Sequence, residues 1–133
     1  MPQLAKGGKW VFGWVLAGPR GELTIPPEAC DEYGFQTGDE VIFLPGSRPS
    51  GGFGLSTPRL LAQMAAPLQT RALCRSQVGQ NGQLVVPSAV GLQPGTRLLA
   101  VRGSGRALGF VVRGSIYDEA LKHSGLEVFG QDS

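Results

Sequence analysis

Short apolar runs separated by glycine- and proline-rich turns follow one another along the whole sequence. Three runs have the length and the β-branched or aromatic content of strands, at 10–17 (WVFGWVLA), 40–44 (EVIFL) and 97–101 (RLLAV). Two shorter runs, at 53–55 (FGL) and 110–112 (FVV), follow the second and the third of these after Gly/Ser-rich segments. Together with 21 glycines and 10 prolines, this pattern predicts a mainly β fold with short helices.

Two stretches of the chain share one motif, GPRGELTIPPEA at 18–29 and GQNGQLVVPSAV at 79–90, in which the turn glycines Gly21 and Gly82 correspond. Farther along the chain, at a shorter offset, the matching pairs are Gly38 with Gly95 and Phe53 with Phe110. The sequence therefore predicts two copies of one unit. Each copy is expected to contain two strands, a short helix, two more strands and a second helix.

The offset shortens because the second copy lacks four residues between Pro87 and Gly95. In the first copy this segment is predicted to be a helix, with Pro27 and Glu28 in its first turn and Gly34 as a left-handed stop. An α-helix turns once per 3.6 residues, so the deletion removes about one turn. The second copy is expected to keep a helical stub and to enter its next strand in nearly the same orientation.

A single unit has too few strands to bury both faces of its sheet, so we expect the two units to close around a pseudo-two-fold axis. Trp10 and Trp14 stand four apart in the first strand, which predicts that they share a face in the core or at a dimer interface. The predicted divisions are an N-terminal tail at 1–8, a first repeat at 9–67, a second repeat at 68–124 and a C-terminal tail at 125–133.

The order of these motifs resembles the AbrB/SpoVT/MazE/MraZ swapped-hairpin family of transition-state regulators. The matching residues are Gly21, LTIP at 23–26 and GDEVIFL at 38–44 in the first copy, and Gly82, LVVP at 84–87 and PGTRLLAV at 94–101 in the second. The resemblance implies a double-psi, swapped-hairpin AbrB-like β-barrel built from two tandem ββαβ-type repeats. It also implies a cytoplasmic, prokaryotic transcription regulator that binds double-stranded DNA as a homodimer or a higher oligomer.

The positions at which this family commonly carries DNA-contacting arginines hold other residues in this chain. Glu22 and Gln83 follow the turn glycines, and the short helix carries Cys30 and Asp31. A second function therefore stays open beside DNA binding. In it the chain is a homo-oligomeric protein-interaction module, antitoxin-like or a scaffold, that keeps the fold without binding DNA.

Charge is distributed unevenly, although the formal net charge is only +2. Residues 46–114 contain eight arginines and no Lys, Asp or Glu, whereas 1–45 and 115–133 each carry a net charge of −3. Arginine suits planar, bidentate contacts with phosphate or carboxylate. In one interpretation the second repeat forms a DNA-binding face from Arg75, Arg97, Arg102, Arg106 and Arg113. In the other, the acidic first repeat and the basic second repeat neutralise each other, within the chain or across a dimer.

The sequence contains no recognisable catalytic or metal-ligating constellation. His123 is the single histidine, with no Cys, Asp or Glu at ligand spacing, so neither a metal site nor a Ser–His–acid set is predicted. Cys30 and Cys74 form no CxxC motif, which predicts reduced thiols in the cytoplasm. No apolar run is long enough to span a membrane. We therefore expect no enzymatic activity, no cofactor and no membrane partner.

Overall fold

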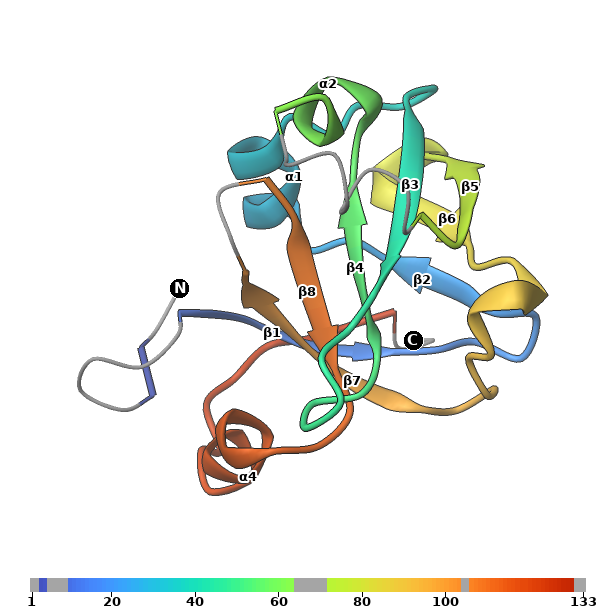
Figure 1. Cartoon of the computed structure of the whole chain (residues 1–133). Coiled ribbons are helices and arrows are strands. Elements are labelled where there is room, and N and C mark those ends of the chain that lie inside the picture. Colours follow the sequence, from blue (N-terminus) through green and yellow to red (C-terminus); the bar gives the residue numbers. More distant parts are fainter. Residues whose placement is uncertain (1–2, 5–9, 64–71, 104–105, 131–133) are drawn as a thin grey trace.

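The computed structural model of the chain describes residues 3–4, 10–63, 72–103 and 106–130. Its strands are β1 (Val11–Leu16), β2 (Glu22–Thr24), β3 (Glu40–Pro45), β4 (Phe53–Ser56), β5 (Cys74–Gln77), β6 (Gln83–Val85), β7 (Arg97–Arg102), β8 (Leu108–Val111) and β9 (Val128–Phe129). Its helices are α1 (Pro27–Tyr33), α2 (Pro58–Leu61) and α4 (Ser115–Leu121), with 3₁₀ turns η1 (Gln80–Gly82) and η2 (Ser88–Val90). The fold is mainly β with short helices, as predicted (Figure 1).

Seven strands form one mixed sheet in the order β5-β3-β4-β8-β7-β1-β9, and β2 pairs with β6 in a separate two-stranded ribbon. The first strand of each predicted repeat pairs with the third strand of the other, because β1 pairs with β7 and β5 pairs with β3. Across the six strands from β5 to β1, the order from either end is therefore the first strand of one repeat followed by the third and fourth strands of the other. Among the described strands the sheet stays open, with β5 and β9 at its edges.

The registers of the two exchanged pairs are equivalent. In β1–β7, Leu16 lies opposite Arg97, and in β5–β3, Gln77 lies opposite Glu40. Leu16 and Gln77 occupy equivalent positions of the two repeats, and so do Glu40 and Arg97, at the two offsets that relate the repeated motifs. The same cross-strand contact thus occurs twice, once at each side of the sheet.

Two other strand pairs join equivalent residues of the two halves directly. Leu23 lies opposite Leu84 in the β2–β6 ribbon, and Phe53 lies opposite Phe110 in β4–β8. An approximate two-fold axis therefore passes between the members of each pair. The predicted boundary between the repeats, at 67/68, lies outside the described residues.

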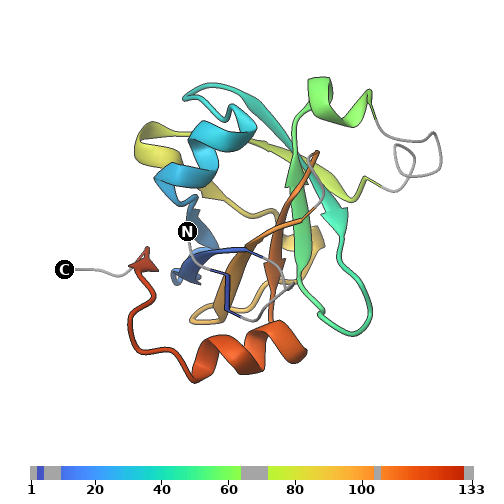
Figure 2. The same ribbon diagram turned by 90° about the vertical axis from the view of Figure 1, so that its left-hand side faces the viewer.

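The third strand of the second repeat, β7, is buried on both faces. Leu98 and Ala100 belong to the main core, which also contains the inward-facing residues of the ribbon. Leu99 and Val101 point the other way and pack with α4 through Ala120. The helices lie at two ends of the molecule, α1 and α2 at one end and α4 at the other (Figures 1 and 2).

The first helix and its shortened counterpart follow the predicted difference between the copies. α1 begins at Pro27, and the residue that follows its end, Gly34, adopts the left-handed conformation with φ 74°. In the second half a single 3₁₀ turn, η2, is followed in the same way by Gly91 with φ 80°. Left-handed backbone is cheap for glycine alone, so each glycine fixes the end of its helical segment.

Two details differ from the sequence-based expectations. Trp14 is buried, but Trp10 is 40% exposed, because a β-bulge shifts the register between Val11 and Gly13 and rotates the preceding residues. The segment predicted as a C-terminal tail contains β9, which pairs in parallel with β1.

Within the described ranges, none of the helices combines the length and the apolar content that a membrane span requires.

We predict that the ribbon is a main source of stability because it covers the core. Leu23 is 2% exposed, and replacing it with Ala should lower the free energy of unfolding by about 2–5 kcal/mol. The matched control is Val85→Ala on the partner strand, where the side chain is 56% exposed; the expected change is within about 0.5 kcal/mol. Urea denaturation measures both, and equal losses would contradict this role of the ribbon.

Candidate nucleic-acid interface

The five arginines predicted to bind DNA lie in three places. Arg75 is on the edge strand β5, far from the others in the strand order. Arg102 ends β7 and Arg106 lies in the loop that follows, so both are at the end of the β7–β8 hairpin beside α1. Arg97 begins β7 and Arg113 follows β8, which places them at the opposite end, beside the loop that joins β3 to β4 (Figure 1).

Arg75 forms an ion pair with a carboxylate of the first repeat. Its Nη1 donates to Glu40 Oε1, and the two side chains are 61% and 44% exposed. The partners come from neighbouring strands, since β5 pairs with β3. The contact therefore holds an acidic residue of one repeat against a basic residue of the other.

Arg102 makes a bidentate ion pair with Glu32 at the end of α1. Its Nε donates to Glu32 Oε2 at 2.7 Å, and its Nη2 donates to Glu32 Oε1. These hydrogen bonds raise the pKa of the guanidinium above its usual value. Arg106 and Glu28, near the same end of the sheet, also have interaction partners. At this end the acidic helix of the first repeat thus meets the basic hairpin of the second.

Arg97 stacks on an aromatic ring instead of meeting a carboxylate. Its guanidinium carbon lies 4.1 Å from the centroid of the Trp14 ring, and this indole packs edge-on against Tyr117 at 5.1 Å. The Tyr117 hydroxyl donates to the Arg97 carbonyl oxygen at 3.0 Å. Cation–π stacking leaves the edge of the guanidinium, with its N–H donors, free to meet an anion.

Arg113 is held against the loop at 46–52. Its Nη2 donates to the Arg48 carbonyl oxygen at 2.9 Å, and the backbone N–H of Val112 donates to the Ser50 carbonyl oxygen at 3.0 Å. The loop is therefore fastened to the end of β8. Arg48, Arg97 and Arg113 together form what we call the loop-side arginine group; within the described residues none of the three makes an ion pair with a carboxylate.

The first turn of the repeated motif, at 18–22, is closed by one of its own side chains. Glu22 folds back over the turn, and its Oε2 accepts a hydrogen bond from the Arg20 backbone N–H at 3.0 Å. The Glu22 side chain also fills the space beside Gly18, where an added Cβ would lie 2.0 Å from a Glu22 oxygen. Glu22 therefore closes the turn within the chain.

Sequence reasoning missed Arg48 and the carboxylate partners Glu32 and Glu40. For Glu40 the repeat contained a usable signal. Glu40 is equivalent to Arg97, and Arg75 is equivalent to Trp14, so the same pair of positions meets in both halves once the strands are exchanged. Only knowledge of which strands pair converts that equivalence into a contact.

Among the described residues, no group of three or more His, Cys, Asp or Glu side chains could hold a metal ion.

Comparison with known proteins gives little further information. No protein-family model and no curated protein matches the chain. Among solved structures, the chain is similar to the solution structure of PHS018 from Pyrococcus horikoshii, with 17% sequence identity and a TM-score of 0.37. That match covers 78% of this chain and 91% of the other.

We predict that ionisation of Tyr33, next to the Glu32–Arg102 pair, destabilises the fold at high pH. Burial, and after it the Glu32 carboxylate, raises the pKa of Tyr33 from 10.0 to about 12. Between these pH values the unfolded chain loses a proton that the folded chain keeps, so stability falls as the pH rises above 10. The loss should reach on the order of 2 kcal/mol by pH 12.

Urea denaturation between pH 9 and 12 measures this effect. Tyr33→Phe should flatten the alkaline decline, and the matched variant Tyr117→Phe should keep it. An unchanged decline in Tyr33→Phe would assign the alkaline loss to other groups.

Proposed function

We propose that the chain has the double-psi, swapped-hairpin topology of the AbrB-like regulators. The support is the exchange of strands, in which β1 pairs with β7 and β5 pairs with β3. The ribbon also joins the two halves, because β2 pairs with β6. Within the first half the Gly18 N–H donates to the Glu22 carbonyl oxygen of β2, and within the second half the Ser76 hydroxyl of β5 donates to the Val85 carbonyl oxygen of β6. In this proposal the ribbon, whose Leu23 and Leu84 belong to the main core, closes the open side of the sheet into the barrel.

We further propose that the protein is a cytoplasmic, DNA-binding, transcription-regulator-like protein, and that the loop-side arginine group carries the contact. The observation that supports this surface is the absence of carboxylate ion pairs at these three side chains in the described part of the chain. Arg75 and Arg102, by contrast, already meet Glu40 and Glu32. An arginine in an ion pair must give up its carboxylate before it can bind a phosphate, so the three unpaired arginines bind phosphate at a lower cost.

The loop-side arginine group suits the phosphate backbone more than base edges. The backbone hydrogen bonds from Val112 and Arg113 to Ser50 order the loop before binding, and the Trp14 ring orders Arg97. Pre-ordered donors lose less conformational freedom on binding. Phosphate contacts position a protein on the duplex and bind many sequences with similar affinity.

Binding to random duplex DNA across a salt series tests this surface. Three phosphate contacts should give a slope of log K against log[salt] of roughly −3. Arg48→Gln and Arg97→Gln should each weaken binding and reduce the slope by about 1. Arg75→Gln is the matched control, because its partner is Glu40, and it should leave the slope unchanged. An equal loss in all three variants would contradict the assignment of the surface.

A second candidate function is a homo-oligomeric interaction module that keeps this fold without binding DNA. It is favoured by the Arg75–Glu40 and Arg102–Glu32 pairs and by the closure of the turn by Glu22. The acidic and basic repeats then neutralise each other within one chain. In this case duplex DNA would not bind even at low salt, and sedimentation would still show self-association.

A further inference from the structure

The loop that joins β3 to β4, residues 46–52, has one long cationic side chain at its tip. It begins after the last cross-strand pair of these strands, Pro45 opposite Phe53, and lies at the end of the sheet where α4 lies (Figures 1 and 2). Arg48 and Pro49 are exposed. Within the described residues, the Arg48 side chain makes no hydrogen bond and no ion pair. Its guanidinium donors are therefore available to a partner.

The backbone of this tip is held in place. The Gly51 N–H donates to the Ser47 carbonyl oxygen at 2.9 Å, which closes the tip into a tight turn. Arg113, after β8, donates from Nη2 to the Arg48 carbonyl oxygen at 2.9 Å. Pro49 has a fixed φ and disfavours the helical region for the residue before it. The loop therefore presents Arg48 from an ordered backbone, which lowers the entropy lost on binding.

The serine hydroxyls of the loop are used inside it. The hydroxyls of Ser47 and Ser50 hydrogen bond to each other, and Ser50 Oγ lies 3.4 Å from the Ser47 carbonyl oxygen. Ser47 can thus donate to Ser50, and Ser50 to that carbonyl oxygen. The Ser50 backbone N–H also donates to Ser47 Oγ, at 3.3 Å. Arg48 is therefore the side chain of the loop that retains unused donors.

A single arginine at a narrow tip suits the minor groove of a duplex. The pattern of donors and acceptors in the major groove is read by several side chains of a helix or a β-ribbon. The minor groove shows only acceptors at A·T pairs, whereas at G·C pairs the guanine amino group stands in it. A-tracts narrow this groove and strengthen its negative potential, which attracts arginine. A guanidinium also enters it more easily than an ammonium, because it is more weakly hydrated.

The two other members of the loop-side arginine group are fixed to the sheet through their side chains. Arg97 stacks on the Trp14 ring at 4.1 Å. The Arg113 guanidinium lies against the loop, where a Cβ added to Gly51 would be 2.9 Å from its Nη1. Both residues lie at the same end of the paired strands β7 and β8. Only Arg48 of the three is anchored through its backbone alone.

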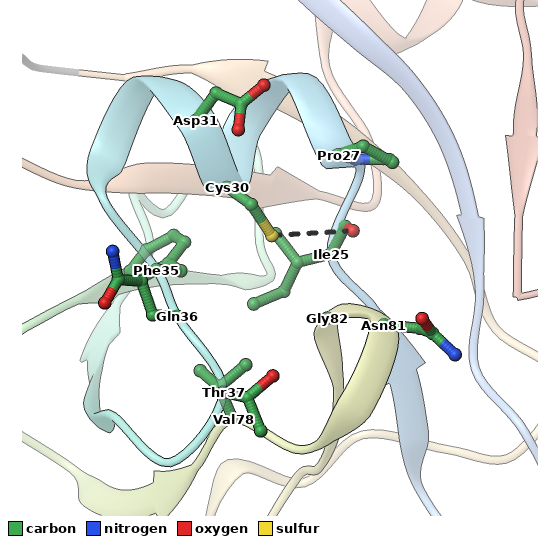
Figure 3. A pocket seen from close by; sticks show the side chains of 10 residues that line it. All are labelled: Ile25, Pro27, Cys30, Asp31, Phe35, Gln36, Thr37, Val78, Asn81 and Gly82. Carbon is green, nitrogen blue, oxygen red and sulfur yellow. Dashed lines mark hydrogen bonds between the residues drawn. The ribbon is translucent and has the colours of Figure 1, made fainter.

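The cavity between α1 and residues 78–82 gives DNA no comparable anchor (Figure 3). None of its lining residues is Lys, Arg or His, and one of them, Asp31, is acidic. Ile25, Phe35 and Val78 are buried, so they close its inner wall. A DNA strand meets neither a cation nor an accessible apolar surface there.

We propose that Arg48 enters the minor groove of A·T-rich duplex DNA, with Arg97 and Arg113 on phosphates beside it. The inference rests on the proposed DNA binding and adds to it a preference for groove shape. This preference follows the width and the potential of the minor groove, so it needs no contact in the major groove.

Four duplexes of one length test the proposal, built from A·T, G·C, inosine·C or diaminopurine·T pairs. Inosine lacks the minor-groove amino group of guanine, and diaminopurine adds that group to adenine, while each keeps the major-groove pattern of its parent base. Fluorescence anisotropy titrations with the full chain at one low salt concentration measure the affinities. The A·T and inosine·C duplexes should bind about tenfold more tightly than the G·C and diaminopurine·T duplexes.

Two variants separate the groove contact from the phosphate contacts. Arg48→Lys keeps the charge, so the slope of log K against log[salt] should stay the same, but the preference for A·T and inosine·C should fall several-fold. Arg97→Gln is the matched control at a phosphate contact. It should weaken binding to all four duplexes equally, reduce the slope by about 1 and keep the preference.

Three results would overturn this inference and leave the proposed DNA binding in place. They are equal affinities for the four duplexes, a grouping of A·T with diaminopurine·T against G·C with inosine·C, and an unchanged preference in Arg48→Lys. The second result would assign the preference to the major groove. An absence of binding to every duplex at low salt would overturn the proposed DNA binding and this inference together.

Discussion

The first strand of each half completes the sheet of the other half, and the rest of the structure depends on this exchange. β1 pairs with β7, and β5 pairs with β3, in equivalent registers. Both halves also contribute to the burial of β7, because Leu99 and Val101 pack with Val11 and Trp14 of the first half as well as with Ala120 of the second. The ribbon β2–β6 then covers the core between them, with Leu23 and Leu84 on the approximate two-fold axis.

The exchange also decides what the charged residues do. It brings Glu40 beside Arg75 and Glu32 beside Arg102, so the acidic first repeat and the basic second repeat neutralise each other over part of the surface. The equivalent of the Glu40–Arg75 contact on the other side of the sheet is the stacking of Arg97 on Trp14. One position of the fold therefore holds an ion pair in one half and an exposed cation stacked on an indole ring in the other.

The sequence could predict equivalence between the halves but not contacts between them. The motif repeat, the α1 helix with its Gly34 stop and the shortened η2 follow from local rules of turns and helix ends. The separation of the five predicted arginines into three places needs the strand pairing, which is a long-range property. The bulge that exposes Trp10 leaves no local mark that separates it from a regular strand. The cavity between α1 and residues 78–82 likewise needs residues that are far apart in the sequence, such as Cys30 and Asn81.

The most direct measurement of the strand exchange is a set of cross-strand nuclear Overhauser contacts in an isotope-labelled sample. The account predicts contacts of Val15 with Leu98 and of Ser76 with Val41, within one chain. Samples that mix labelled and unlabelled chains establish whether each contact is intramolecular. Contacts of Val15 with Val41 and of Ser76 with Leu98 would show that each half pairs its own strands, and would contradict the account.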